Sequence, residues 1–163
     1  MSGLNDVLER MATIQANIVA TMPNGKTEKV TGAYPYIQGD IPSTMVPFFA
    51  NEVSDWTSDA YAVGGSLGQH IQTPIKSHLC LMGSEQGVSL AVNLQTIIAW
   101  RDAVYAAFAA AVQLNKGLGQ IPNVTEAYIS SGGLESVQLG SNTYAGIRFD
   151  FTLTEHFTVP VGS

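Results

Sequence analysis

Apolar residues near the start of the chain recur at three- and four-residue steps. The apolar positions of this segment are Leu4, Val7, Leu8, Met11, Ile14, Ile18 and Met22. They form one continuous stripe, and this spacing predicts an amphipathic helix. We expect Ser2 or Asn5 to cap its start and Pro23-Asn24-Gly25 to end it.

A second helical pattern runs from about Val92 to Leu114, and Gly117 and Gly119 are expected to end it. Its apolar stripe consists of Ile97, Trp100, Val104, Phe108 and Ala111. The alanines between residues 106 and 110 raise the helix propensity and permit close approach to neighbouring elements.

The last third of the chain has the pattern of β-strands. Strands are expected over Val124–Ser130 and Leu134–Leu139, with a turn at Ser131-Gly132-Gly133 between them. Gly140-Ser141-Asn142 predicts a tight hairpin turn into a final strand. In that strand one face is apolar, consisting of Ala145, Ile147, Phe149, Phe151 and Leu153. The two-residue period predicts one face in the core and one outside.

The segment from residue 26 to 69 has weaker patterns. Thr27 to Tyr36 predicts a short strand, and Met45 to Ala50 predicts another, which Pro47 favours placing at a sheet edge. Residues 51 to 69 mix aromatic side chains with glycines, and we expect a long hairpin or an extended arm there.

His70 to Met82 alternates again, with Ile71, Thr73, Ile75, Leu79 and Leu81 on one face. The other face is polar, and Pro74 favours an exposed or edge strand. The order of helix, strands, helix and strands predicts an α+β fold, in which two amphipathic helices pack on one face of a mostly antiparallel sheet. We expect residues 1–163 to form a single domain.

Charged residues make up only 12% of the chain, about half the usual share of a soluble domain. A surface so poor in charge indicates contact with partners, and the alternative is an exterior of neutral polar residues. The formal net charge is −6 with 7 Lys and Arg, so no basic face for nucleic acid is expected. The start of the chain lacks a signal-peptide pattern, and no apolar run approaches the roughly 18 residues of a membrane span.

Candidate chemical groups are few. The single Cys80 excludes an internal disulfide and a cysteine-rich metal site. On a strand, His70 and His78 would lie roughly 26 Å apart, so they cannot share a metal. No other metal-ligand spacing involves these residues or His156, and we interpret all three histidines as surface residues. Cys80, between two leucines, is interpreted as a packed or half-exposed residue rather than a nucleophile.

Other polar groups point to no reaction. The stretch from Gly64 to Gly68 lacks the lysine and strand-to-helix context of a phosphate loop, and is interpreted as a flexible tip. Asp55, Asp59 and Asp102 are interpreted as solvated acids. We therefore expect no catalytic residue, no metal, no cofactor and no enzyme activity, although distant residues can converge in a fold.

Several segments of the chain are similar to the tail-terminator, or tail-completion, proteins of long-tailed bacteriophages. These segments are the opening helix, Tyr34-Pro35-Tyr36, Ile41-Pro42 to Phe49, Trp100 to Phe108, Leu118-Gly119, Val124 to Ile129, and the final strand from Tyr144 to Glu155. The final strand has the order aromatic, small, Gly, apolar, any residue, aromatic, and ends in Thr154-Glu155. The likeness covers most of the chain, and the 55–69 segment is longer than the family's pattern.

The resemblance implies a structural virion protein at the head-proximal end of the tail, assembled in the host cytoplasm. It implies a ring, usually a hexamer, that caps the tail tube, stops its polymerisation and joins it to the head-completion or connector protein. DNA would pass through the ring without specific binding, which the acidic balance suits.

Interface residues are expected in the least regular segment of the chain. We predict that Phe48, Phe49, Trp56 and Tyr61 contact a second copy or another partner. Two alternatives remain at this point: another head-tail joining or tail-tube protein, and a small soluble enzyme or ligand-binding domain. A ligand-binding domain would have a deep pocket with convergent polar groups.

Overall fold

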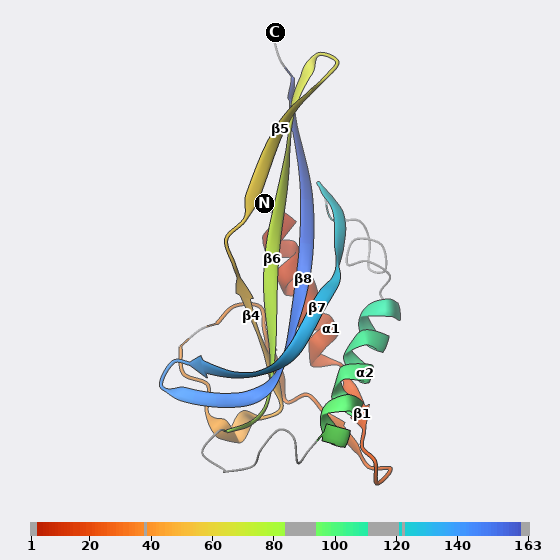
Figure 1. Cartoon of the computed structure of the whole chain (residues 1–163), viewed down its shortest axis with the longest axis vertical. Helices are drawn as coiled ribbons and strands as arrows, with labels where there is room; N and C mark the ends of the chain where they lie inside the picture. Colours follow the sequence, from red (N-terminus) through yellow and green to blue (C-terminus); the bar gives the residue numbers. More distant parts are fainter. Residues whose placement is uncertain (1–2, 38, 84–93, 111–120, 122, 161–163) are drawn as a thin grey trace.

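A computed structural model of the chain describes residues 3–37, 39–83, 94–110, 121 and 123–160 (Figure 1). The two helices are α1 (Gly3–Ala16) and α2 (Leu94–Ala110), and a 3-10 turn, η1, spans Ser43–Met45. The strands are β1 (Val19–Thr21), β2 (Thr27–Lys29), β3 (Gly32–Tyr34), β4 (Phe48–Val53), β5 (Thr57–Val63), β6 (Ser66–Gly83), β7 (Val124–Leu139) and β8 (Asn142–Pro160).

Six strands form one sheet in the order β3-β4-β6-β8-β7, and β5 also pairs with β6. The β3–β4 pairing is parallel, whereas β4–β6, β5–β6, β6–β8 and β7–β8 are antiparallel. Strands β1 and β2 form a separate antiparallel pair. Together with the two helices, this sheet confirms the predicted α+β class.

β4 and β5 lie on the same side of β6, one after the other. β4 pairs with Ile75–Cys80, and β5 pairs with residues 66–72. Pro74 of β6 lies opposite the gap between β4 and β5. Its carbonyl oxygen accepts a hydrogen bond from the Ser54 amide at 3.0 Å, and its nitrogen points to the same side of β6. Because neither β4 nor β5 pairs with β6 at Pro74, the lack of an N–H on this proline removes no hydrogen bond from the sheet. β6 is therefore a central strand rather than the predicted edge strand. Pro47 also gives no edge strand, because β4 begins after it and lies between β3 and β6.

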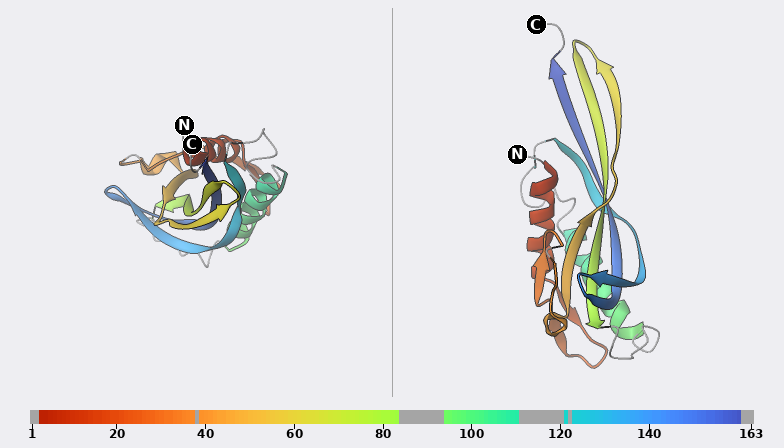
Figure 2. Two further views of the ribbon diagram at one scale, coloured as in Figure 1. Left: turned by 90° about the horizontal axis from the view of Figure 1, so that it is seen from above. Right: turned by 90° about the vertical axis from the view of Figure 1, so that its left-hand side faces the viewer.

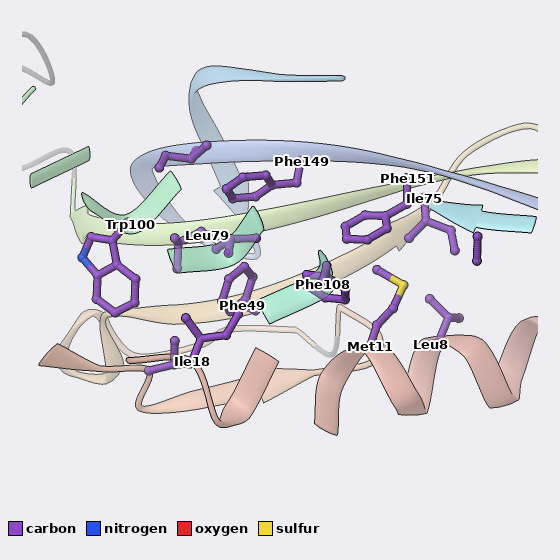
Figure 3. Packing of buried hydrophobic residues seen from close by; sticks show 14 of the residues in the cluster. Leu8, Met11, Ile18, Phe49, Ile75, Leu79, Trp100, Phe108, Phe149 and Phe151 are labelled. Carbon is purple, nitrogen blue, oxygen red and sulfur yellow. The ribbon is translucent and has the colours of Figure 1, made fainter. Parts of the chain in front are cut away.

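The main core contains apolar side chains from both helices and from β4, β6 and β8 of the sheet. Figure 3 shows Leu8 and Met11 of α1 directed toward Ile75 and Phe151 of the sheet. The predicted stripe of α2 is buried at Ile97, Trp100, Val104 and Phe108, whereas Ala111 lies outside the described residues. The apolar face of β8 is buried from Ala145 to Leu153 as predicted.

A second, smaller core lies on the opposite face of the sheet. Its buried members are Ile41, Phe48, Ala50, Cys80, Leu139 and Tyr144. The Phe48 ring meets those of Tyr34 and Tyr144 edge to face, with centroid distances of 6.0 and 5.1 Å. Because neighbouring strand residues point to opposite faces, Phe49 enters the main core and Phe48 enters this one.

The turn end of the β7–β8 hairpin bends across this second core (Figures 1 and 2). Asp40 fixes the turn, since its carboxylate accepts the Ser141 amide at 2.6 Å and the Ser141 hydroxyl at 2.9 Å. These bonds lower the pKa of Asp40. Gly140 has φ of +64° in the two-residue turn, which a side chain would strain.

Two predicted boundaries are wrong. Helix α1 ends at Ala16 rather than at Pro23. The Asn17 side-chain amide donates a hydrogen bond to the Thr13 carbonyl at the end of the helix, and Ile18 begins the turn into β1. Residues 131–133 form no turn: β7 is one strand with a bulge between Ile129 and Ser131. The bulge and the glycines let the strand bend without ending. The predicted end of the second helix, with Gly117 and Gly119, lies outside the described residues.

Beyond the helices, the sheet continues as an arm. We define the arm as β5, residues 66–72 of β6 and residues 154–160 of β8, which pair with one another. Figures 1 and 2 show its tip projecting well past α1, α2 and β7, with neither helix beside it. The 51–69 segment, for which a hairpin or arm was predicted, thus contains the end of β4, all of β5, the β5–β6 turn and the start of β6.

Candidate assembly surfaces

Possible metal ligands and the single cysteine are both present among the described residues. Within this part of the chain, no three His, Cys, Asp or Glu residues are grouped to hold a metal ion. Cys80 is packed in the second core at 1% exposure, and burial, followed by the nearby Glu135, raises the pKa of its thiol to about 12. A thiol that stays protonated is a poor nucleophile, so its role is packing.

His78 is not the surface residue that was predicted, because its residue exposure is 3%. Its Nε2 lies 2.9 Å from Glu52 Oε2 on β4, and its Nδ1 is hydrogen-bonded to Glu135 Oε1 on β7. Glu135 reaches His78 across β8 at Gly146, which is in register with both Glu135 and Cys80. We call Glu52, His78 and Glu135 the clamp, since it joins three strands on the face opposite the helices.

The clamp controls the charge of His78. Burial lowers the pKa of His78, but the hydrogen bonds that its ring donates to Glu135 and Glu52 raise it by more, so the net pKa lies above the ordinary value of 6.5. A protonated imidazole between two carboxylates satisfies both of its N–H donors. The clamp therefore stabilises the bent part of β7, and it offers no open nitrogen to a substrate.

The arm presents large side chains without a covering layer. Of the β5 side chains that the structure describes, none is buried. Trp56, just before β5, is 63% exposed, and Leu67 near the tip is 54% exposed. Of the 64–68 stretch, which was interpreted as a flexible tip, residues 64 and 65 form the short turn between β5 and β6, and residues 66–68 belong to β6. Gly64 in this turn has φ of +57°.

An aromatic cluster lies on one face of the arm. The half-buried Tyr61 packs over Gly68, where any side chain would overlap its ring. Its ring centroid lies 4.5 Å from that of His70, and the His70 and His156 rings are 3.7 Å apart. The sequence suggested no such pair, because the two histidines are 86 positions apart and meet only through the β6–β8 register.

An apolar groove lies between α2 and β7, with a volume of about 310 Å³. Its lining includes Leu94, Ile98, Tyr105 and Leu134, which are four of the nine large hydrophobic side chains exposed in the described chain. Arg101 is its one charged lining residue, and it pairs with the neighbouring Asp102 at 2.9 Å. A groove of this composition is suited to an apolar surface rather than to a polar small molecule.

The groove follows an open sheet edge. Among the described residues, β7 pairs only with β8, so it is an edge strand of this part of the sheet. At the level of the arm, β5 is the opposite edge of the same sheet. In the described part of the sheet, β7 is the edge strand on one side, and β3 and β5 are the edge strands on the other.

The structure separates the four predicted interface residues into two groups. Phe48 and Phe49 are both 0% exposed, so the prediction that they contact a partner is wrong: each fills a core. Trp56 and Tyr61 lie on or beside the arm, and their contact with a partner stays a prediction. The groove was not predicted from the sequence, although Leu94, Ile98 and Tyr105 at helical spacing form a second apolar stripe on α2.

Comparisons with protein-family models and with curated protein sequences find no match to this chain. No helix within the described residues is long and apolar enough to cross a membrane.

Proposed function

We propose that this chain is a structural protein that assembles with copies of itself into a ring at the head-proximal end of a phage tail tube. In that position it stops tube polymerisation and joins the tube to the head connector. The proposed role comes from the resemblance of the sequence to tail-terminator proteins. The observation that carries it in the structure is the combination of two open sheet edges with exposed apolar side chains beside them.

The placement of these edges favours a ring. Because β5 and β7 are on opposite sides of the sheet, contact between them joins two copies head to tail. Repeated head-to-tail contacts close into a ring when the rotation between copies permits it. The α2–β7 groove then lies beside the joint, where Leu134 and Tyr105 would be covered by the neighbouring copy.

The two faces of such a ring differ, so one face can bind the tube and the other the connector. The arm projects from the helix-covered part (Figure 1), and the exposed Leu67 on the arm and Trp56 beside it can make one of these contacts. In this proposal the sheet is mostly antiparallel and both helices pack on one face, so the tip of the arm extends beyond them. The net charge of −6 suits a bore through which DNA slides without binding.

The alternative of an enzyme or ligand-binding domain has less support. It requires a pocket with convergent polar groups, whereas the α2–β7 groove is lined mainly by apolar side chains. The buried polar groups of the clamp are hydrogen-bonded to one another.

Electron microscopy of particles produced without this chain tests the proposal. We expect full heads beside unjoined tails of uncontrolled length, and restoration of joined particles when the purified protein is added. Tails of normal length joined to heads would contradict the proposal. Absence of tails altogether would indicate the tube-protein alternative.

A further inference from the structure

One face of the arm is apolar. On β6, Leu67 and Gln69 point to the same face, because side chains alternate along a strand. Leu67 is directly opposite Ala62. Gln69 is directly opposite Ala60 on β5 and Phe157 on β8, and directly opposite residues share a face. We call Ala60, Ala62, Leu67 and Phe157 the arm face. Leu67 is 54% exposed and neither alanine is buried, so burial of this face needs a partner.

The arm face is out of reach of the α2–β7 groove of its own chain. Leu67 is opposite Val159 of β8, and the groove residue Leu134 is opposite Ile147 of the same strand. These two positions on β8 are 12 residues apart, which corresponds to roughly 40 Å at the rise of a strand. Figures 1 and 2 also show the tip of the arm well away from α2. Contact between the two surfaces therefore needs a second molecule.

The arm face and the groove have matching chemistry. The groove presents four exposed apolar side chains, those of Leu94, Ile98, Tyr105 and Leu134. Contact with the arm face would remove apolar area of both surfaces from water, which favours association. Each surface also lies beside an edge strand of the described sheet, β5 at the arm face and β7 at the groove. Edge strands of two copies can pair through their backbones.

The charges of the two surfaces are complementary. The sequence of the arm contains Asp59 and Glu155 but no Lys or Arg, and Asp59 is the exposed one of these two acids. The one charged side chain that lines the groove is Arg101, which is 56% exposed. Its Nε and Nη2 donate to the neighbouring Asp102, and its Nη1 takes part in neither bond. An exposed ion pair of this kind is weak, so Arg101 can also pair with Asp59 of another copy.

We propose that the arm of one copy of this chain docks in the α2–β7 groove of a second copy, with Leu67 against the apolar lining and Asp59 beside Arg101. The proposal rests on the self-assembly proposed above and names the two surfaces that make it. The contact is heterologous, so a pair of copies keeps one free arm and one free groove, and further copies can repeat the contact until a ring closes. Trp56 is then left for the contact with the tube or the connector.

Two full-length variants with complementary defects test this contact. Leu67→Asp disables the arm face and keeps the groove, whereas Leu134→Asp disables the groove and keeps the arm face. Both positions are at least 50% exposed, so both variants should fold, which circular dichroism checks. In sedimentation velocity, with and without tail tubes, each variant alone should associate roughly tenfold or more weakly than the unchanged protein. Their equimolar mixture should form dimers that grow no further, because it contains one intact pair of surfaces.

Two further variants separate the contact from a general effect of charge. Thr158→Asp is the matched control, because Thr158 is exposed on the other face of the arm, and it should associate as the unchanged protein does. Arg101→Asp should weaken association about two- to fivefold, and Asp59→Arg in the same chain should restore it.

Unchanged association of the Leu67→Asp variant would overturn the docking of the arm in the groove and leave the proposed ring standing. If that variant also lost binding to tubes, the arm would belong to the contact with the tube. A mixture of the two defective variants that stays monomeric would overturn the pairing of these two surfaces. An unchanged protein that is monomeric with and without tubes would overturn both this contact and the ring.

Discussion

The body and the arm are parts of one sheet, but they have different surroundings. In the body, β4, β6 and β8 contribute side chains to the main core, which also contains residues of α1 and α2, and β4, β6 and β8 also contribute to the second core. In the arm, the same β6 and β8 continue with β5, and neither helix lies beside the tip (Figure 1). The body therefore contains most of the burial that stabilises the fold, whereas the arm presents side chains whose burial needs a partner.

The largest expected difference between the body and the arm is at the two tryptophans. Trp100 on α2 is 1% exposed in the main core, and Trp56 beside the arm is 63% exposed. We expect Trp100→Ala to lower the free energy of unfolding by about 3–5 kcal/mol, through lost burial and the cavity left behind. Trp56→Ala should change it by less than about 0.5 kcal/mol. Urea unfolding followed by circular dichroism measures both, and similar losses for the two variants would contradict the distinction.

The clamp gives an intermediate effect that depends on pH. The pKa of His78 is raised in the folded chain, so its contribution to stability is complete below about pH 6.5 and is lost as the pH rises through the folded value. We expect the free energy of unfolding to fall as the pH increases above about 6.5. Glu135→Gln should lower stability by about 1–3 kcal/mol at pH 6 and flatten that dependence.

Glu126→Gln is the matched control for the clamp, because Glu126 lies on the same strand but is exposed. Its unfolding free energy should follow the unchanged protein at every pH. A Glu135→Gln protein that keeps the full pH dependence would show that His78 is not its source.

The smallest effect on folding is expected at the groove. Leu134 is 50% exposed, so Leu134→Asn should change the unfolding free energy of the isolated chain by less than about 0.5 kcal/mol. If the groove is covered by a neighbouring copy, the same variant should weaken self-association. Sedimentation velocity over a range of concentrations measures this, with exposed Ser136→Asn on the same strand as the control. Equal association of both variants would exclude the groove from the interface.

Local sequence patterns predicted the elements in which one apolar face of a helix or strand packs against one core. The stripe of α2 and the alternation of β8 each place one apolar face against one core, so periodicity alone identifies them. The turn at Gly140 was equally readable, because two residues with a glycine at positive φ suit a hairpin.

Other features depend on contacts between residues far apart in the sequence, which local patterns do not reveal. His78 follows the polar side of an alternating strand, yet the bent end of β7 covers it and supplies Glu135. Phe48 and Phe49 were predicted to contact a partner, but a sheet with a core on each face buries both. Pro74 suggested an edge strand, since nothing in the sequence shows that β4 and β5 leave a gap opposite it.

The mass of the purified protein, alone and after mixing with tail tubes, tests the central claim that this chain is built to be covered by copies of itself. Native mass spectrometry of the untagged chain should give a closed assembly of about six chains of 17.3 kDa, either free in solution or only at tube ends. A 17.3 kDa monomer that neither associates nor binds tubes would contradict the account.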